Sequence, residues 1–463
     1  MATKILKFPR TLSVFTLAMI NVAAVGSVKS WPFIAEYGFA ALFYLILTAV
    51  FFFFPVSLVS AELATGWPKK GGVFTWVKEA FGPKWGFLAI WLLWIENFAW
   101  YPTILAFIAS AVAYIIDPAL AEHKLYTLSF VLVSFWACTF ANLFGMRTSG
   151  WISTIGAIFG TILPGLLIVT LGLIWYFSGH PLQISFDAAS FLPNFSLDQM
   201  VFFTGILLAF CGMEMSSVHA LDVRHPQKDY PRAIFLSALI IFSLTLLGVL
   251  SIAMVVPKSD ISLVAGALQA ITVFIEKYGI GWMVPYIAGL IAIGSVGAVS
   301  TWIIGPCKGV LAAAEEGDLP PIFKKTNANG VPVSLILTQG IVVSVLCLMF
   351  LLMPTVSSTF WIFTVLAAQL YLIMYILMFA AAIKLRYSKP DVPRPYKIRG
   401  GHLGMWLVAG FGIIGSAFAL IIGYFPPSQI ATGSRTFYMS FLILGTAIGC
   451  LLPIFIIRRS RRH

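Results

Sequence analysis

The stretch Phe210-Cys211-Gly212-Met213-Glu214 lies in the middle of an apolar segment that runs from about residue 200 to about residue 220. An apolar helix of about 20 residues is long enough to cross a lipid bilayer. A carboxylate at its middle is unfavourable by about 3 kcal/mol or more unless protein or water surrounds it. Gly212 weakens the helix at the same depth. Because an interrupted helix at that depth must be buried in protein or line a cavity, the stretch predicts one half of a binding site.

The composition places the whole chain in a membrane. Its 463 residues are 60% hydrophobic and only 10% charged, whereas a soluble protein has about 25% charged residues. The five cysteines lie far apart in apolar runs and show no disulfide or metal pattern. The formal net charge of +12 is spread over short loops, which favours lipid head groups over nucleic acid as its partner. We therefore expect no cofactor, no metal and no nucleic acid.

Apolar stretches of membrane-spanning length recur along the chain without a long polar stretch that would separate two domains. The expected spans lie near residues 11–35, 39–64, 85–116, 125–145, 151–177, 199–221, 233–257, 282–314, 333–353, 359–385, 404–425 and 436–457. The predicted fold class is therefore an all-α polytopic membrane protein of about 12 transmembrane helices, with residues 1–463 in a single domain. With both termini in the cytoplasm, most lysines and arginines fall in cytoplasmic loops, as the positive-inside rule requires.

A second helix interruption is predicted in the first span, where Ala23-Ala24-Val25-Gly26-Ser27 forms a run of small residues at mid-depth. The first and sixth spans cross the membrane in opposite directions, and paired interruptions in two inverted halves indicate a transporter site. The alternative is that the small residues only allow close helix packing. The coincidence with Glu214 favours the site.

The directions of the two interrupted helices predict what this site binds. The outer half of the first span begins near Gly26 and points backbone N–H groups at the cavity, which suits a carboxylate. The first half of the sixth span ends near Cys211 and points carbonyl oxygens at the same cavity, which suits an ammonium group. A site with both features fits a zwitterionic amino acid.

Several different short motifs lie at the ends and the interruptions of the expected spans. They are Ala61-Glu62-Leu63-Ala64-Thr65, Gly71-Gly72-Val73-Phe74, residues 212–214, Asp229-Tyr230-Pro231 and residues 250–257, 302–309 and 329–333. Together they resemble the amino acid–polyamine–organocation superfamily, and within it the glutamate/γ-aminobutyrate antiporter family, over nearly the full chain. The resemblance implies a five-plus-five inverted repeat with broken helices 1 and 6. The repeats would cover about 11–177 and 199–385, with two extra helices at about 404–457.

The resemblance implies secondary active transport by alternating access, not catalysis. The expected reaction exchanges an acidic amino acid such as glutamate for a related or decarboxylated one such as γ-aminobutyrate, often in acid resistance. The expected setting is the inner (plasma) membrane of a bacterium, as a monomer or homodimer. Family members can carry a folded cytoplasmic plug, but this sequence stops at His463 soon after the last span, so no plug is expected.

Two other functions compete with exchange. One is a proton-coupled amino acid symporter, and the other is a non-transporting membrane receptor or scaffold. Intact helix interruptions and aromatic residues in the expected cavity count against a receptor. The sequence contains no Gly-rich phosphate loop of an ATP-driven pump and no nucleophile–base pattern of an enzyme.

Three ionisable residues are candidates for the chemistry of the site. Glu214 matches the acid of the superfamily's sixth span, and we expect it to gate, to sense protons or to bond to the broken backbone, the alternative being a structural acid. Lys29 stands where a neutral residue is expected, and it either attracts the side-chain carboxylate of a glutamate-like substrate or extends to the membrane interface. Glu96, in the third span, either takes part in proton coupling or pairs with Lys29.

The remaining candidates are aromatic and gating residues. In related antiporters, the positions of Trp302, Tyr371 and Tyr375 lie around the substrate, although bundle packing is an equal alternative for each. Tyr371 and Tyr375 are four residues apart and share a helix face. The predicted substrate-binding residues are Ala24, Val25, Gly26, Ser27, Lys29, Cys211, Gly212, Met213, Glu214, Trp302, Tyr371 and Tyr375. The predicted proton-coupling or gating residues are Glu214, Glu96 and Glu62, the last as a structural element and not a substrate ligand.

Overall fold

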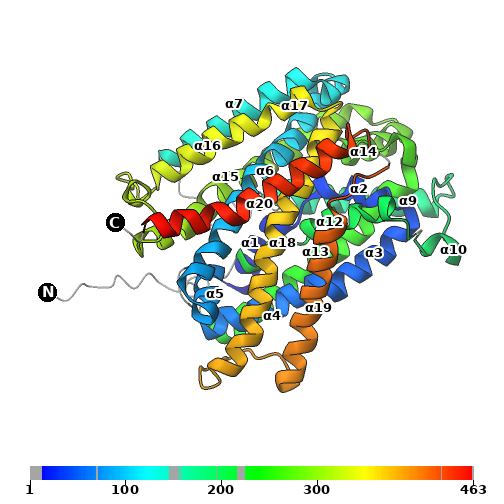
Figure 1. Ribbon diagram of the computed structural model, residues 1–463. Coiled ribbons are helices and arrows are strands. Elements are labelled where there is room, and N and C mark those ends of the chain that lie inside the picture. Colours follow the sequence, from blue (N-terminus) through cyan, green and yellow to red (C-terminus); the bar gives the residue numbers. More distant parts are fainter. Residues whose placement is uncertain are drawn as a thin grey trace.

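The chain is helical throughout the part that the structure describes. The computed structural model describes residues 13–68, 71–144, 156, 158–193, 195–215, 225–428 and 430–460. Within these ranges it contains helices and no strand (Figure 1). The predicted all-α fold is confirmed.

The helical elements follow one another with short connections. In the first half they are α1 (Val14–Val25), η1 (Val28–Ser30), α2 (Trp31–Ala35), η2 (Gly38–Ala40), α3 (Ala41–Thr48), η3 (Ala49–Phe53), α4 (Phe54–Gly66), α5 (Val73–Phe81), α6 (Pro83–Ile116), η4 (Pro118–Glu122), α7 (Lys124–Leu143), η5 (Ile158–Ile162) and α9 (Leu163–Phe177). In the second half they are α10 (Ala188–Phe191), α11 (Leu197–Met200), α12 (Phe202–Ala209), α13 (Pro226–Val255), η7 (Lys258–Asp260), α14 (Gly266–Lys277), η8 (Gly281–Met283), α15 (Val284–Glu315), η9 (Pro321–Lys324), α16 (Val333–Cys347), α17 (Met349–Leu352), α18 (Val356–Ser388), α19 (Gly401–Ile422) and α20 (Arg435–Ser460).

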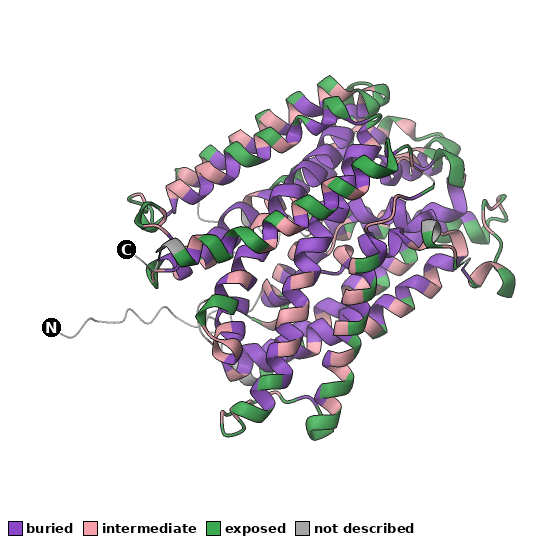
Figure 2. Ribbon diagram, viewed as in Figure 1, coloured by how far each residue is buried: buried purple, intermediate pink, exposed green. Residues whose placement is uncertain are grey.

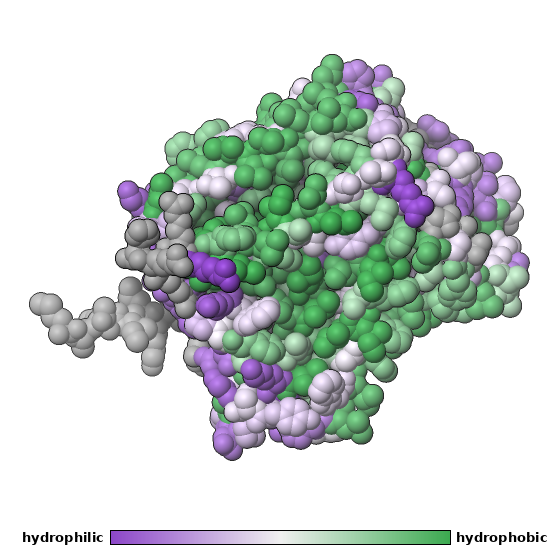
Figure 3. Space-filling model, viewed as in Figure 1, coloured by the Kyte–Doolittle hydropathy of each residue, from purple (hydrophilic) through white to green (hydrophobic). Residues whose placement is uncertain are grey.

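Eleven helical stretches among the described residues are long and apolar enough to cross a membrane. A further apolar segment, Phe202–Met215, is shorter. It corresponds to the expected span at 199–221, whose last residues lie outside the described ranges. Figure 3 shows hydrophobic residues over most of the visible face, with hydrophilic residues mostly at its margins. This surface suits a lipid environment, and the chain is a multi-pass membrane protein.

The first span is interrupted at the predicted residues. α1 ends at Val25, and Gly26 (ψ 124°) and Ser27 (φ −155°, ψ 126°) have extended backbones. The helix resumes at Val28, where the Ser27 hydroxyl accepts the Lys29 backbone N–H at 3.3 Å. The span is therefore two half-helices joined by an extended dipeptide.

The sixth span is interrupted beside the first. α12 ends at Ala209, and Gly212 has a φ of +114°, a conformation that favours glycine. A Cβ atom on Gly212 would lie 3.3 Å from Val25 Cγ2, at the end of α1. The two interruptions are therefore in contact, although they lie far apart in the sequence.

Two π-helical turns pack against these interruptions. The Thr161 hydroxyl of η5 donates to the Gly26 carbonyl at 2.9 Å. The Phe53 ring of η3 lies 4.8 Å from the Phe210 ring. Single π turns inside α-helices are frequent at functional sites. Here one π turn contacts each of the two helix interruptions.

The helix α18 runs through the middle of the bundle, where it contacts α6 and α19 (Figure 1). Of its most apolar 18-residue stretch, 83% is buried, compared with 28% for the peripheral α20. Figure 2 shows this contrast between the buried α18 and the outward faces of α19 and α20. The position of α18 brings its polar side chains to the broken helices.

We predict that Gly294→Ala destabilises the contact between α15 and η5. A Cβ atom on Gly294 would lie 2.1 Å from the backbone nitrogen of Gly160, and backbone atoms cannot easily give way. Overpacking of this kind destabilises by about 1–3 kcal/mol, which a lower apparent melting temperature in detergent would reveal. The control is Gly289→Ala on the same helix, where the nearest atom lies 3.7 Å away. Equal melting temperatures for the two variants would contradict this packing.

Candidate functional site

Two adjoining cavities lie beside the helix interruptions. The first has a volume of about 50 Å³ and the second of about 110 Å³. The first is lined by Ala24, Val25, Ser27, Lys29, Ser30, Phe33, Glu96, Asn97, Trp100, Gly205, Leu208, Ala209, Cys211, Trp302, Thr364 and Tyr371. The second shares Ala24, Ser27, Trp100 and Trp302 with it and also contacts Gly26. Either cavity holds a few waters but not a whole amino acid, so a substrate requires the walls to separate.

The predicted residues divide into three groups by location. Those on the cavity walls are Ala24, Val25, Gly26, Ser27, Lys29, Glu96, Cys211, Trp302 and Tyr371. Those that line neither cavity but adjoin the second interruption are Gly212, Met213, Glu214 and Tyr375. Glu62 belongs to a separate network at the end of α4.

Glu214 joins the second interruption to α18. It is 2% exposed, and its two carboxylate oxygens accept hydrogen bonds from the Tyr371 hydroxyl at 2.6 Å and the Tyr375 hydroxyl at 2.5 Å. The Tyr375 hydroxyl also accepts the Gly212 backbone N–H at 2.7 Å. The two tyrosine rings stack with centroids 4.9 Å apart. Both carboxylate oxygens of Glu214 thus accept hydrogen bonds from the protein. The two tyrosine hydroxyls bind Glu214 in this structure, not a substrate.

Lys29 places a buried cation in the first cavity. It is 6% exposed, and its Nζ donates to the Thr103 hydroxyl at 2.9 Å. Nζ lies 5.4 Å from the Trp100 ring centroid and 5.5 Å from that of Phe360. Within the described ranges no carboxylate forms an ion pair with it, so the alternative of pairing with Glu96 is not seen. A buried cation without a counter-ion attracts an anionic ligand strongly.

Glu96 presents an unpartnered oxygen in the same cavity. The side chain is 1% exposed, and its Oε1 accepts a hydrogen bond from Asn97 Nδ2 at 2.7 Å. Asn97 Nδ2 also donates to the Leu93 carbonyl at 2.8 Å, which fixes the amide. Glu96 Oε2 and Asn97 Oδ1 accept no hydrogen bond from the described residues. Both acceptors therefore belong to residues that line the first cavity.

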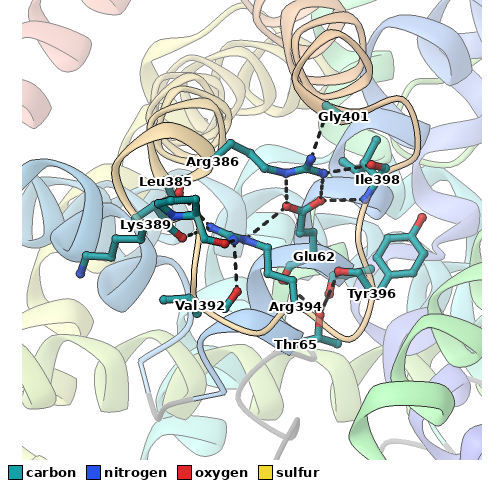
Figure 4. A network of polar contacts seen from close by, with 12 residues as sticks. Glu62, Thr65, Leu385, Arg386, Lys389, Val392, Arg394, Tyr396, Ile398 and Gly401 are labelled. Carbon is teal, nitrogen blue, oxygen red and sulfur yellow. Dashed lines mark hydrogen bonds and ion pairs between the residues drawn. The ribbon is translucent and has the colours of Figure 1, made fainter.

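Glu62 forms a buried ionic network away from the cavities (Figure 4). Arg386 donates to both of its oxygens, from Nε at 2.5 Å and from Nη2 at 2.6 Å. The Ile398 backbone N–H donates to it at 2.8 Å, and Arg394 Nε lies 3.5 Å away. Arg386 also donates to the carbonyls of Ile398 and Gly401. The network ties the end of α4 to α18 and to the connection before α19.

Several residues of these networks were missed by the sequence analysis. They are Thr103, Thr161, Arg386 and Arg394. Thr103 carried a usable signal, because it lies seven residues after Glu96 and therefore on the same face of one helix. Arg386 carried none, since it lies 324 residues from Glu62 and counts as a loop cation in the sequence.

Comparison with known proteins agrees with this architecture. Residues 11–448 match the family described as amino acid permease. The chain is 47% identical over 445 residues to an uncharacterized transporter of Legionella pneumophila, covering 96% of each chain. It is 32% identical over 454 residues to a glutamate/gamma-aminobutyrate antiporter of Lactococcus lactis, covering 96% of this chain and 90% of the relative. It is 28% identical over 394 residues to a probable agmatine/putrescine antiporter of the same species, covering 84% and 82%.

The family match extends over nearly the whole chain and includes both interruptions and α18. The resemblance to the amino acid–polyamine–organocation superfamily is thereby confirmed. The chain belongs to the amino acid permease family of membrane transporters.

Proposed function

We propose that this protein is a secondary active exchanger that works by alternating access. It exchanges an acidic amino acid such as glutamate for a related or decarboxylated one such as γ-aminobutyrate. The proposal rests on the buried cation of Lys29, which has no carboxylate partner among the described residues and lies beside the contact of two interrupted helices. A relative with the same exchange in its name is 32% identical over 454 residues.

Each part of the substrate has a partner in this site. The half-helix that begins at Val28 offers its N-terminus to the α-carboxylate. The end of α12 at Ala209 offers carbonyl oxygens to the α-ammonium group. Lys29 is then left for a side-chain carboxylate. This arrangement favours an acidic amino acid over a neutral one.

The proposal also gives α18 a role in transmitting movement between elements. Glu214 couples the second interruption to α18 through Tyr371 and Tyr375, so movement of either element is transmitted to the other.

The distribution of basic residues supports cytoplasmic termini in a bacterial inner membrane. We also infer the five-plus-five inverted repeat from the opposite directions of the two interrupted spans.

Uptake of labelled glutamate into liposomes tests the proposed function. An exchanger takes up label only into vesicles loaded with a substrate such as γ-aminobutyrate, and empty vesicles stay at background. Accumulation in empty vesicles under a pH gradient would identify a symporter instead. Absence of uptake in both would identify a protein that does not transport glutamate.

We predict that Lys29→Met selectively weakens the binding of acidic substrates. Methionine keeps the apolar volume beside Trp100 but removes the charge. A hydrogen bond to a charged group contributes about 1.5–3 kcal/mol, so the apparent affinity for glutamate should fall by about 10- to 150-fold. Glutamine, which has the same shape without the charge, serves as the control substrate in the same counterflow measurement. An unchanged ratio of glutamate to glutamine affinity would show that Lys29 does not contact the substrate side chain.

A further inference from the structure

Glu96 and Thr103, the residue that binds Lys29, lie on one face of α6. Glu96, Trp100 and Thr103 follow the i, i+4, i+7 spacing of a single helix face. The Lys29 ammonium donates to Thr103, and Glu96 lies two helical turns before Thr103. Seven residues of α-helix separate the Cα atoms of Glu96 and Thr103 by about 10.5 Å along the axis. The cavity between these ends is bordered by the rings of Trp100 and Trp302, whose centroids are 5.6 Å apart.

The Glu96 end of this face has the chemistry of an amine subsite. Glu96 Oε2 and Asn97 Oδ1 are both acceptors, both buried and both without a partner among the described residues. A buried acceptor left without a donor is unfavourable by about 1–3 kcal/mol, so the pair requires an external donor. A substrate ammonium group has three N–H donors, so it can satisfy both oxygens and still donate to a carbonyl at the end of α12, which lines the same cavity. Lys29 does not fill this role, because its Nζ forms no ion pair with Glu96 among the described residues.

We propose that Glu96 and Lys29 together read the separation between a carboxylate and an amine in the substrate. This inference rests on the proposed function and assigns a part of the substrate to each residue. Glutamate and γ-aminobutyrate share one unit, a carboxylate joined through three carbons to an amine. Its extended length is about 5–6 Å from bond lengths of about 1.5 Å, and a hydrogen bond of about 2.8 Å at each end brings the span to about 11 Å. Lys29, Glu96 and Asn97 line the same cavity, as recognition of both ends of this unit requires.

The proposal explains how one site accepts both substrates of an exchanger. The shared unit lies between Lys29 and Glu96, and only the α-carboxylate differs between glutamate and γ-aminobutyrate. In this arrangement the α-carboxylate of glutamate lies on the Ser27 side of the cavity, and γ-aminobutyrate has no group there. Asn97 is a positioning residue in this arrangement, because its amide orients the Glu96 carboxylate.

Ligand-induced shifts in the melting temperature of the purified full-length protein test this assignment without requiring transport. Ligands that bind the folded state raise the melting temperature, and the rise grows with the logarithm of the ligand concentration divided by Kd. The probes are γ-aminobutyrate, which has both ends, and glutarate, which has two carboxylates and no amine. Glu96→Gln keeps the shape of the side chain and the acceptor for Asn97. We expect Glu96→Gln to lower the affinity for γ-aminobutyrate at least tenfold. Glutarate should bind this variant more tightly than the wild type, because its second carboxylate no longer faces the carboxylate of Glu96.

The control variant is Glu276→Gln, the same substitution at the exposed end of α14, which should leave both affinities at the wild-type value. An unchanged γ-aminobutyrate affinity in Glu96→Gln, or an equal loss for γ-aminobutyrate and glutarate, would overturn the assignment. These outcomes leave the proposed function intact if the wild type still shows glutamate counterflow. Wild-type protein with neither counterflow nor a glutamate-induced shift would instead refute the proposed function itself.

Discussion

Glu214→Gln is expected to lower the exchange rate about tenfold or more while the protein remains folded. The carboxylate accepts hydrogen bonds from both Tyr371 and Tyr375, whereas the glutamine amide has one acceptor oxygen and presents an NH₂ group on the other side. One tyrosine hydroxyl therefore loses its acceptor, and hydrogen bonds to charged groups contribute about 1.5–3 kcal/mol each. The expected loss follows from the conversion of about 1.4 kcal/mol per factor of ten.

The measurement is the initial rate of glutamate counterflow at two pH values, in parallel for Glu214→Gln, Tyr371→Phe and Tyr375→Phe. Tyr375→Phe should have the larger effect of the two tyrosine variants, because only Tyr375 also accepts the Gly212 N–H. If Glu214→Gln keeps both the wild-type rate and its pH dependence, the carboxylate has no role in coupling the broken helix to α18. Equal effects of the two tyrosine variants would place the coupling elsewhere than at Gly212.

Glu62→Gln is expected to produce the largest loss of stability among the substitutions considered. One carboxylate compensates two guanidinium groups, and Glu62 and Arg386 are 1% and 3% exposed. Breaking a buried ion pair by removing one partner destabilises by about 3–5 kcal/mol, because the remaining charge stays buried. The substitution also replaces one acceptor of the Ile398 N–H and Arg386. A large fall in the apparent melting temperature in detergent is the expected result.

Glu79→Gln provides the matched control for Glu62→Gln. Glu79 forms an ion pair with Lys389, at the start of the same connection, but the two side chains are 25% and 37% exposed. Exposed pairs contribute about 0–1 kcal/mol, so the control should change the melting temperature little. If the two variants shift it equally, burial is not what makes the Glu62 network important.

The positions of the helix interruptions were predictable because their causes are local. A carboxylate and a glycine in one apolar segment define Gly212 and Glu214, and a run of small residues defines the extended dipeptide at Gly26 and Ser27. The lengths of the apolar stretches likewise predicted the spans, since a helix must cover the thickness of the bilayer. These features can therefore be predicted without knowing which segments pack against them.

The partners of the ionisable residues were not predictable, because they come from distant segments. The sequence left open whether Lys29 pairs with Glu96, and the structure bonds it to Thr103 instead. Tyr371 and Tyr375 were expected around the substrate, yet both hydroxyls donate to Glu214. Their shared helix face was visible from the spacing of four residues, but the acceptor 157 residues away was not.

In the proposed function, one site exchanges an acidic amino acid for its decarboxylated relative. The most direct test loads liposomes with γ-aminobutyrate, adds labelled glutamate outside, and measures glutamate entry and γ-aminobutyrate exit in the same vesicles. We expect the two fluxes to be equal and Lys29→Met to lower both together. Glutamate entry without γ-aminobutyrate exit, or equal fluxes that Lys29→Met leaves unchanged, would contradict it.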